Sequence, residues 1–358
     1  MTSLFITRNP QTSSPSKANP PQENPTMPVS VPLSLLDLAR VQPNEPAAEG
    51  LARSVRLART ADQLGYHRLW FAEHHNMRAV ASAATALIIQ HVAAQTTNLR
   101  VGAGGVMLPN HSPLVIAEQY GTLETLFPGR IDLGLGRAPG TDMDTMRALR
   151  RDGRESDRFP SDVVELHGFL SGHTHIPGVH AYPGRGTNVP LFILGSSLFG
   201  AQLAAQLGLP YAFASHFAPQ ALNQAARIYR ETFESSGPLA GPDAKPHFMA
   251  AVNVIAADDV ETAREQRRQA EDEWLQGILG RQHTLSQEEL AAVRHMPQAR
   301  QVLTMLDRTI AGTQADVISG LEALVEEVQA DELILVNLAV GEEHKHRTLE
   351  LLAPKAAS

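Results

Sequence analysis

The chain has 358 residues, of which 43% are hydrophobic and 19% are charged, enough apolar material for a large core. Its formal net charge of −8 argues against a nucleic-acid-binding protein, because binding to phosphate backbones rests on clustered Lys and Arg. The absence of cysteine excludes disulfides, iron–sulfur clusters, thiolate zinc sites and cysteine nucleophiles, and no apolar run approaches the roughly 18–20 residues of a membrane-spanning helix. We therefore expect a soluble, cytoplasmic protein.

The first 28 residues differ in composition from the rest of the chain. They are rich in Pro, Ser, Thr, Asn and Gln and lack the apolar segment of a targeting signal. Such a composition does not bury enough surface to offset the entropy that ordering costs. The sequence predicts a disordered N-terminal tail over residues 1–28 and one domain over residues 29–358.

From residue 29 onward, short apolar runs alternate with segments of helical periodicity. Runs that are apolar on both faces are typical of parallel strands covered by helices. The expected strands are 31–36, 68–72, 99–107, 131–135, 191–194, 211–214, 248–255 and 332–336. The expected helices are 51–64, 83–94, 113–126, 161–170, 201–207, 219–233 and 315–328. This alternation predicts an α/β protein that forms a single (β/α)8 TIM barrel with loop insertions, rather than two domains.

Some residues mark the ends of these elements. Gly65 follows the first helical stripe and suits a helix C-terminus, and Thr313 followed by Asp316 resembles a capping box. Two stretches, 171–190 and 272–300, interrupt the alternation. We expect both to be loop insertions of the kind that form lids in barrel enzymes.

Chemistry in a barrel is located at the carboxyl ends of the strands, and Glu73, His74 and His75 directly follow one strand. Adjacent residues on an extended chain face opposite ways, so two neighbouring histidines rarely bind one metal ion. One of the two could face the mouth of the barrel as a general acid or base. Alternatively, both histidines are satisfied by loop carbonyl groups.

The strand around residues 101–105 is unusually rich in glycine, including Gly104 and Gly105. Glycine weakens a strand, so this density indicates either that a flat ring approaches the backbone or that the barrel bends here. The sequence favours neither reading.

Arg137 and Arg147 follow the next strand. The glycines before Arg137 do not form a dinucleotide-binding loop, because position 139 is proline where a third glycine is needed. Guanidinium groups bind phosphate oxygens in a bidentate manner, so both arginines are candidate phosphate ligands. The alternative is a surface ion pair with Asp142 or Asp144.

Ser196 and Ser197 connect a strand to a helix that is expected to begin near Phe199. Small polar residues at this place either cap the helix or present backbone N–H groups to an anion. Together with the two arginines they predict a phosphate site.

Five blocks at strand ends together resemble the bacterial luciferase-like flavin monooxygenase family, in particular its single-subunit members of unassigned substrate. The resemblance extends from about Val29 to Leu352. The blocks are SLLD at 34–37, WFAEHHN at 70–76, GGVMLPNHSP at 104–113, FPGRIDLGLGR at 127–137 and LGSS at 194–197.

Membership in this family implies a (β/α)8 barrel that binds reduced FMN supplied by an NAD(P)H:flavin reductase. Oxygen adds at the flavin C4a atom, and the resulting hydroperoxide oxygenates a small organic substrate. The family commonly forms homodimers. By this resemblance His74 is the acid or base near C4a and Glu73 is the carboxylate that supports its loop.

The same resemblance assigns the remaining cofactor contacts. Gly104 and Gly105 match the dipeptide beneath the isoalloxazine ring, which can be joined by a non-prolyl cis bond. Arg137 and Arg147 match arginines on the phosphate side. Ser196 and Ser197 match the phosphate-binding turn between strand and helix.

Two departures put luciferase chemistry itself in doubt. Gly136 stands where the light-emitting subunit has a reactive cysteine, and Gly200 stands where a hydroxyl residue is used on the phosphate side. We therefore expect an FMN-dependent monooxygenase without light emission and without a metal. The alternatives are an F420-dependent hydride-transfer oxidoreductase of the same superfamily, a non-catalytic flavin-binding protein and a metal-dependent barrel hydrolase.

Overall fold

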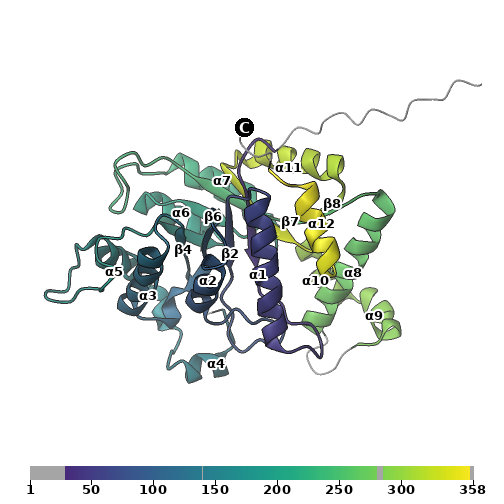
Figure 1. The fold of residues 1–358 in the computed structure, drawn as a ribbon, viewed down its shortest axis with the longest axis horizontal. Coiled ribbons are helices and arrows are strands. Elements are labelled where there is room, and N and C mark those ends of the chain that lie inside the picture. Colours follow the sequence, from purple (N-terminus) through teal and green to yellow (C-terminus); the bar gives the residue numbers. More distant parts are fainter. Residues whose placement is uncertain (1–28, 139, 280–284, 355–358) are drawn as a thin grey trace, which may run out of the picture.

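The computed structural model describes residues 29–138, 140–279 and 285–354. The predicted disordered tail lies outside these residues. Figure 1 shows strands at the centre of the molecule with helices around them. Among the described residues, none of the helices has the length and apolar character needed to cross a membrane.

Eight parallel strands form a closed barrel. The strands of the chain are β1 (Leu33–Asp37), β2 (Arg68–Phe71), β3 (Arg100–Met107), β4 (Ile131–Gly136), β5 (Leu191–Gly195), β6 (Tyr211–Phe213), β7 (Phe248–Ala257), β8 (Ile310–Thr313) and β9 (Glu332–Asn337). The ring runs β6-β5-β4-β3-β2-β1-β9-β7 and is closed by the pairing of β6 with β7. All eight predicted strands are in this ring, so the predicted TIM barrel is confirmed.

The ninth strand, β8, was not predicted. Within the described ranges its one strand partner is the carboxyl-terminal end of β7, where Val254–Ala257 lie beside Ile310–Thr313. Its four residues, Ile-Ala-Gly-Thr, are too short and too weakly apolar to be recognised by pattern.

The helices pack around the barrel and cover the outer faces of the strands. They are α1 (Ala47–Gln63), α2 (Thr85–Ala93), α3 (Pro113–Leu126), α4 (Met143–Ala148), α5 (Phe159–Ser171), α6 (Leu198–Leu207), α7 (Leu222–Glu231), α8 (Val260–Leu279), α9 (Gln287–Arg294), α10 (Pro297–Leu303), α11 (Gln314–Val328) and α12 (Glu342–Leu351). Gly65 follows α1 with a φ of 79°, and Thr313 and Asp316 form the expected capping box of α11.

The stretch 171–190 is an irregular insertion, as predicted, but its position contradicts a lid. It connects the end of α5 to the start of β5, so both of its ends lie at the face of the barrel opposite the mouth. Gly184 packs so closely on Gly121 of α3 that a β-carbon on Gly121 would lie 2.0 Å from the Cα of Gly184.

The prediction of a loop over residues 272–300 is wrong for the described part of this stretch. The helix α8 continues to Leu279, and α9 and α10 follow it. Arg294 pairs with Asp272 at 2.8 Å, which ties α9 to α8. Trp274 of α8 lies under the guanidinium of Arg40, beyond the carboxyl end of β1. The insertion is therefore a helical element beside the mouth.

The interior of the barrel consists of a charged layer below an apolar layer. The Arg68 guanidinium donates hydrogen bonds to Asp132 at 2.7 Å and to Glu332 at 2.7 and 3.0 Å. Above this network, a separate apolar cluster fills the barrel. It comprises Trp70, Phe192, Ala212, Met249, Ala251 and Ile334. The interior is thus filled, and chemistry is confined to the strand ends above it.

Candidate active site at the mouth of the barrel

The alternation along β2 separates His74 from its two neighbours. Arg68 and Trp70 face the interior of the barrel, whereas Leu69 and Phe71 belong to the outer core. His74 has the same parity as the interior residues and lies beyond them, at the mouth. Glu73 has the opposite parity and turns away from the barrel axis. Of the two histidines, this alternation therefore favours His74 as the one that faces the mouth, which stays a prediction.

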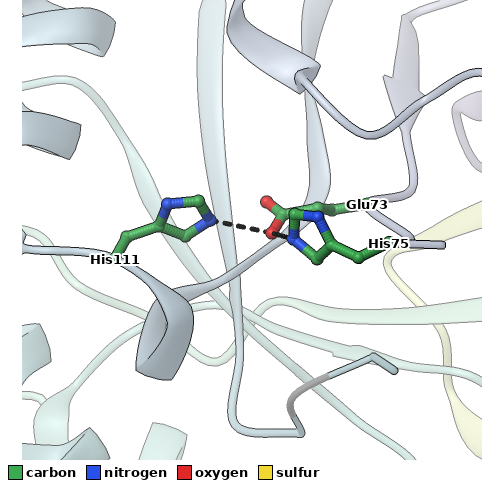
Figure 2. A group of neighbouring side chains, drawn as sticks. All are labelled: Glu73, His75 and His111. Carbon is green, nitrogen blue, oxygen red and sulfur yellow. Dashed lines mark hydrogen bonds and ion pairs between the residues drawn. The ribbon is translucent and has the colours of Figure 1, made fainter. Parts of the chain in front are cut away.

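On the other side, Glu73, His75 and His111 form a group that we call the Glu73 cluster (Figure 2). The Oε1 atom of Glu73 lies 2.8 Å from Nε2 of His75 and 2.8 Å from Nε2 of His111. Its Oε2 atom accepts a hydrogen bond from the backbone N–H of Met107 at 3.4 Å. The cluster therefore joins the end of β2 to the end of β3.

The electrostatics of the Glu73 cluster favour a carboxylate held by imidazoles. Burial acts to raise the pKa of Glu73, but hydrogen bonds from His111 and His75 outweigh it and the net pKa is lowered. The hydrogen bond to Glu73 raises the pKa of His75. The three donor atoms lie within 4.8 Å of one another, close enough to reach one metal ion. The structure instead shows both imidazoles bonded to the carboxylate.

His74 has a different environment. Its backbone N–H donates to the carbonyl of Ser82 at 3.3 Å, and its buried Nδ1 atom has no hydrogen-bond partner among the described residues. Burial lowers the pKa of His74, with Glu73 acting in the opposite direction and His75 in the same direction. At neutral pH this imidazole is therefore mostly uncharged and able to accept a proton. It is suited to act as a general base.

The peptide bond between Gly104 and Gly105 is cis, as the resemblance implied. A β-carbon on Gly104 would lie 2.9 Å from Trp70, and one on Gly105 would lie 2.6 Å from the carbonyl oxygen of Gly134. The pairing of β3 with β4 also shifts register between Ala103 and Val106. Close packing at a bend of the barrel, against side chains at Gly104 and against backbone at Gly105, is thus sufficient to require these glycines.

Arg137 and the start of α6 lie together at the rim. The guanidinium of Arg137 stacks over the ring of Phe199, 4.1 Å from its centroid, and it forms no ion pair within the described part of the chain. Ser197 occupies the N-cap position of α6, but its side chain makes no capping hydrogen bond. Simple capping is therefore not its role here. The open helix N-terminus and the free guanidinium together could hold an anion.

Arg147 is not brought into this group. It lies on α4, is largely exposed and pairs with Asp144 at 2.8 Å. Arg147 thus forms a surface ion pair, which was the alternative to a phosphate ligand. Gly200, which departs from the family pattern, lies in the first turn of α6. Packing explains a glycine there, because a β-carbon would lie 3.0 Å from the ring of Tyr211.

Two further histidines lie near this site, and sequence patterns assigned no role to either. His111 meets Glu73 through a contact between separate loops, which no sequence spacing reveals. His216 lies in a turn three residues beyond the end of β6, where strand alternation no longer predicts the direction of a side chain. Its properties are developed below.

Comparison with known proteins identifies the family. The family model described as luciferase-like monooxygenase matches residues 31–332. A luciferase-like monooxygenase of Escherichia coli (strain K12) is 47% identical over 312 residues, covering 86% of this chain and 91% of that protein.

Solved structures agree with this assignment. The crystal structure of apo-MsnO8 matches with a TM-score of 0.75 and 32% identity, covering 90% of this chain and 96% of that one. The oxygenating constituent of 3,6-diketocamphane monooxygenase, solved with FMN, shares the fold with a TM-score of 0.68 and 16% identity, covering 91% and 98% of the two chains. This chain therefore belongs to the luciferase-like monooxygenase family.

Proposed function

We propose that the protein is an FMN-dependent monooxygenase that binds the flavin across the ends of β3, β4 and β5. The observation that carries this proposal is the anion site at the rim, where Arg137 lies free of acidic partners beside the uncapped start of α6. The three strands are consecutive in the ring, so Gly104, Arg137 and Ser196 lie along one arc of the mouth.

The residues of this arc suit the two ends of FMN. The backbone N–H groups at the start of α6, the hydroxyl groups of Ser196 and Ser197 and the guanidinium of Arg137 would hold the phosphate. Gly104 and Gly105 would lie beneath the ring. Arg147, which pairs with Asp144, is left out of this phosphate site.

Bound reduced FMN would supply the activation of O2, with the flavin delivered by an NAD(P)H:flavin reductase. His74 would move a proton at the reacting atoms, since its imidazole is uncharged and its Nδ1 atom has no hydrogen-bond partner in the described residues. Glu73 would not react itself. It holds the loop that carries His74 by bonding His75 and His111.

The organic substrate is a small molecule oxygenated above the glycine floor. The large apolar side chains Leu87 of α2 and Val115 of α3 are 73% and 44% exposed, which supports a homodimer through these helices. Sedimentation analysis would test the dimer, with a monomer at micromolar concentration as the contradicting result.

The phosphate assignment is tested with two flavins. Arg137→Ala should weaken FMN binding about tenfold or more while riboflavin affinity hardly changes, because only FMN carries the phosphate. Calorimetric titration of both flavins measures this. Equal losses of affinity for the two flavins would contradict the assignment. Purified protein that carries the deazaflavin F420 instead of FMN would favour the hydride-transfer alternative.

The role of His74 is tested separately from binding. His74→Ala should lower the yield of oxygenated product by about 100-fold or more while FMN affinity stays nearly constant, because general acid–base groups act on the chemical step. Single-turnover reactions with reduced FMN and O2 measure it. Undiminished product formation would refute the proton-transfer role.

A further inference from the structure

His216 lies at the mouth directly across from His74. Their strands β6 and β2 are four places apart in the ring in either direction, which makes them opposite walls of the barrel. On β6, Ala212 belongs to the interior apolar cluster. His216 lies in the turn beyond the end of this strand, close enough to His74 for the two imidazoles to interact electrostatically. Both imidazoles therefore lie at the mouth, above the apolar layer.

The neighbouring strand β7 fixes the position of His216. The side-chain amide of Asn253, which is buried, donates to the backbone carbonyl of His216 at 2.5 Å. The hydroxyl of the buried Ser215 donates to the carbonyl of Ala251 at 2.5 Å. The ring of Phe217 contacts the imidazole edge-on, with 4.8 Å between centroids. These contacts hold a residue that lies beyond the end of its strand.

No side-chain hydrogen bond within the described part of the chain explains the place of the His216 imidazole. Its Nδ1 atom is buried and unpaired within the described residues, as is that of His74. Burial lowers the pKa of His216 to about 4, and His74 contributes to this lowering when it is protonated. The ring is therefore uncharged at neutral pH and offers one donor and one acceptor. Buried polar atoms are rarely left unpaired, which points to a bound molecule as the partner.

We propose that His216 contacts the flavin ring system, as the second imidazole of the site opposite His74. The inference rests on the proposed function. The strand of His74 borders β3 and the strand of His216 borders β5, so the two residues flank the arc assigned to FMN. An uncharged imidazole there donates its N–H to a carbonyl oxygen or ring nitrogen of the isoalloxazine.

The test compares His216→Phe with the polar variant His216→Gln. Because both flavins carry the isoalloxazine ring, His216→Phe should lower the affinities for FMN and for riboflavin by the same factor, about tenfold for one lost hydrogen bond. His216→Gln should retain most of the affinity. Arg137→Ala should instead lower the affinity for FMN alone. A loss for both flavins therefore indicates a contact with the ring, and a loss for FMN alone indicates a contact with the phosphate.

A second readout uses the wild-type protein and does not depend on how the variants fold. With 15N-labelled histidine, the imidazole nitrogen signals of His216, assigned by their loss in His216→Gln, should shift when FMN is added. The exposed His91 of α2 serves as a control that should not move. The visible absorption band of bound FMN should also differ between wild type and His216→Phe.

The outcomes separate the two proposals. Wild-type protein that binds neither flavin overturns the proposed function and this inference together. Wild-type protein that binds FMN while the His216 signals stay unchanged overturns this inference alone. Unchanged affinity for both flavins in a folded His216→Phe variant does the same.

Discussion

Acidification should destabilise the protein through His216, and the size of the effect follows from its environment. Burial lowers the pKa of this imidazole in the folded state to about 4, whereas an unfolded histidine titrates near 6.5. The unfolded state therefore binds the proton more readily as pH falls from 6.5 towards 4, so stability present at neutral pH is lost in that window. His74 acts on His216 only when it is protonated, and Ser215 and Asn253, which pack beside His216, are neutral.

The magnitude at pH 5 is calculated from these two pKa values. With pKa values of about 6.5 and about 4, the folding free energy lost between pH 7.5 and pH 5 is at most about 2 kcal/mol. Urea unfolding of wild type and His216→Gln at both pH values measures it, because histidines that do not interact with His216 titrate equally in both proteins and cancel. The variant should lose about 2 kcal/mol less than wild type on acidification. An identical loss in the two proteins would refute the reasoning.

Three further predictions concern the neighbouring residues. Glu73→Gln removes the charge that holds two imidazoles, and should cost about 2–3 kcal/mol of stability and lower the NMR titration midpoint of His75; an unmoved midpoint would show that the carboxylate does not set that pKa. Gly105→Ala should lower the free energy of unfolding by about 2 kcal/mol or more, because its β-carbon would meet the backbone of Gly134. The control Gly277→Ala in α8, where nothing lies within 4 Å of the added β-carbon, should be neutral or slightly stabilising. Equal thermal midpoints for the two variants would contradict the packing argument. Dialysis against EDTA should leave oxygenation unchanged, and activity lost to EDTA and restored by Zn²⁺ would instead show that the Glu73 cluster binds a metal ion.

The barrel could be predicted from the sequence because its strands are buried on both faces. Continuous apolar runs such as 248–255 are unusual outside parallel sheets, and all eight were recognisable in this way. The strand β8 was not predicted, because it lies outside the ring and is half-buried. The helices α9 and α10 were not predicted, because they are short and lie in a stretch without a clear apolar stripe.

The site was only partly predictable. Placement at strand ends made His74, Arg137 and Ser196 candidates, since a barrel brings all strand ends to one face, and their roles stay predictions. Contacts between separate loops, such as that of His111 with Glu73, depend on side-chain packing that spacing does not encode. The surface position of Arg147 was likewise left open by its sequence, because nearby acidic residues suit either reading.

The central claim is that FMN lies across one arc of the barrel mouth. A crystal structure of the protein with FMN tests it most directly. We predict the phosphate within hydrogen-bond distance of Arg137 and the start of α6, and the ring above Gly104 and Gly105 between the two opposing imidazoles. Crystals in which FMN is bound elsewhere, or in which saturating FMN leaves the mouth empty, would contradict the account.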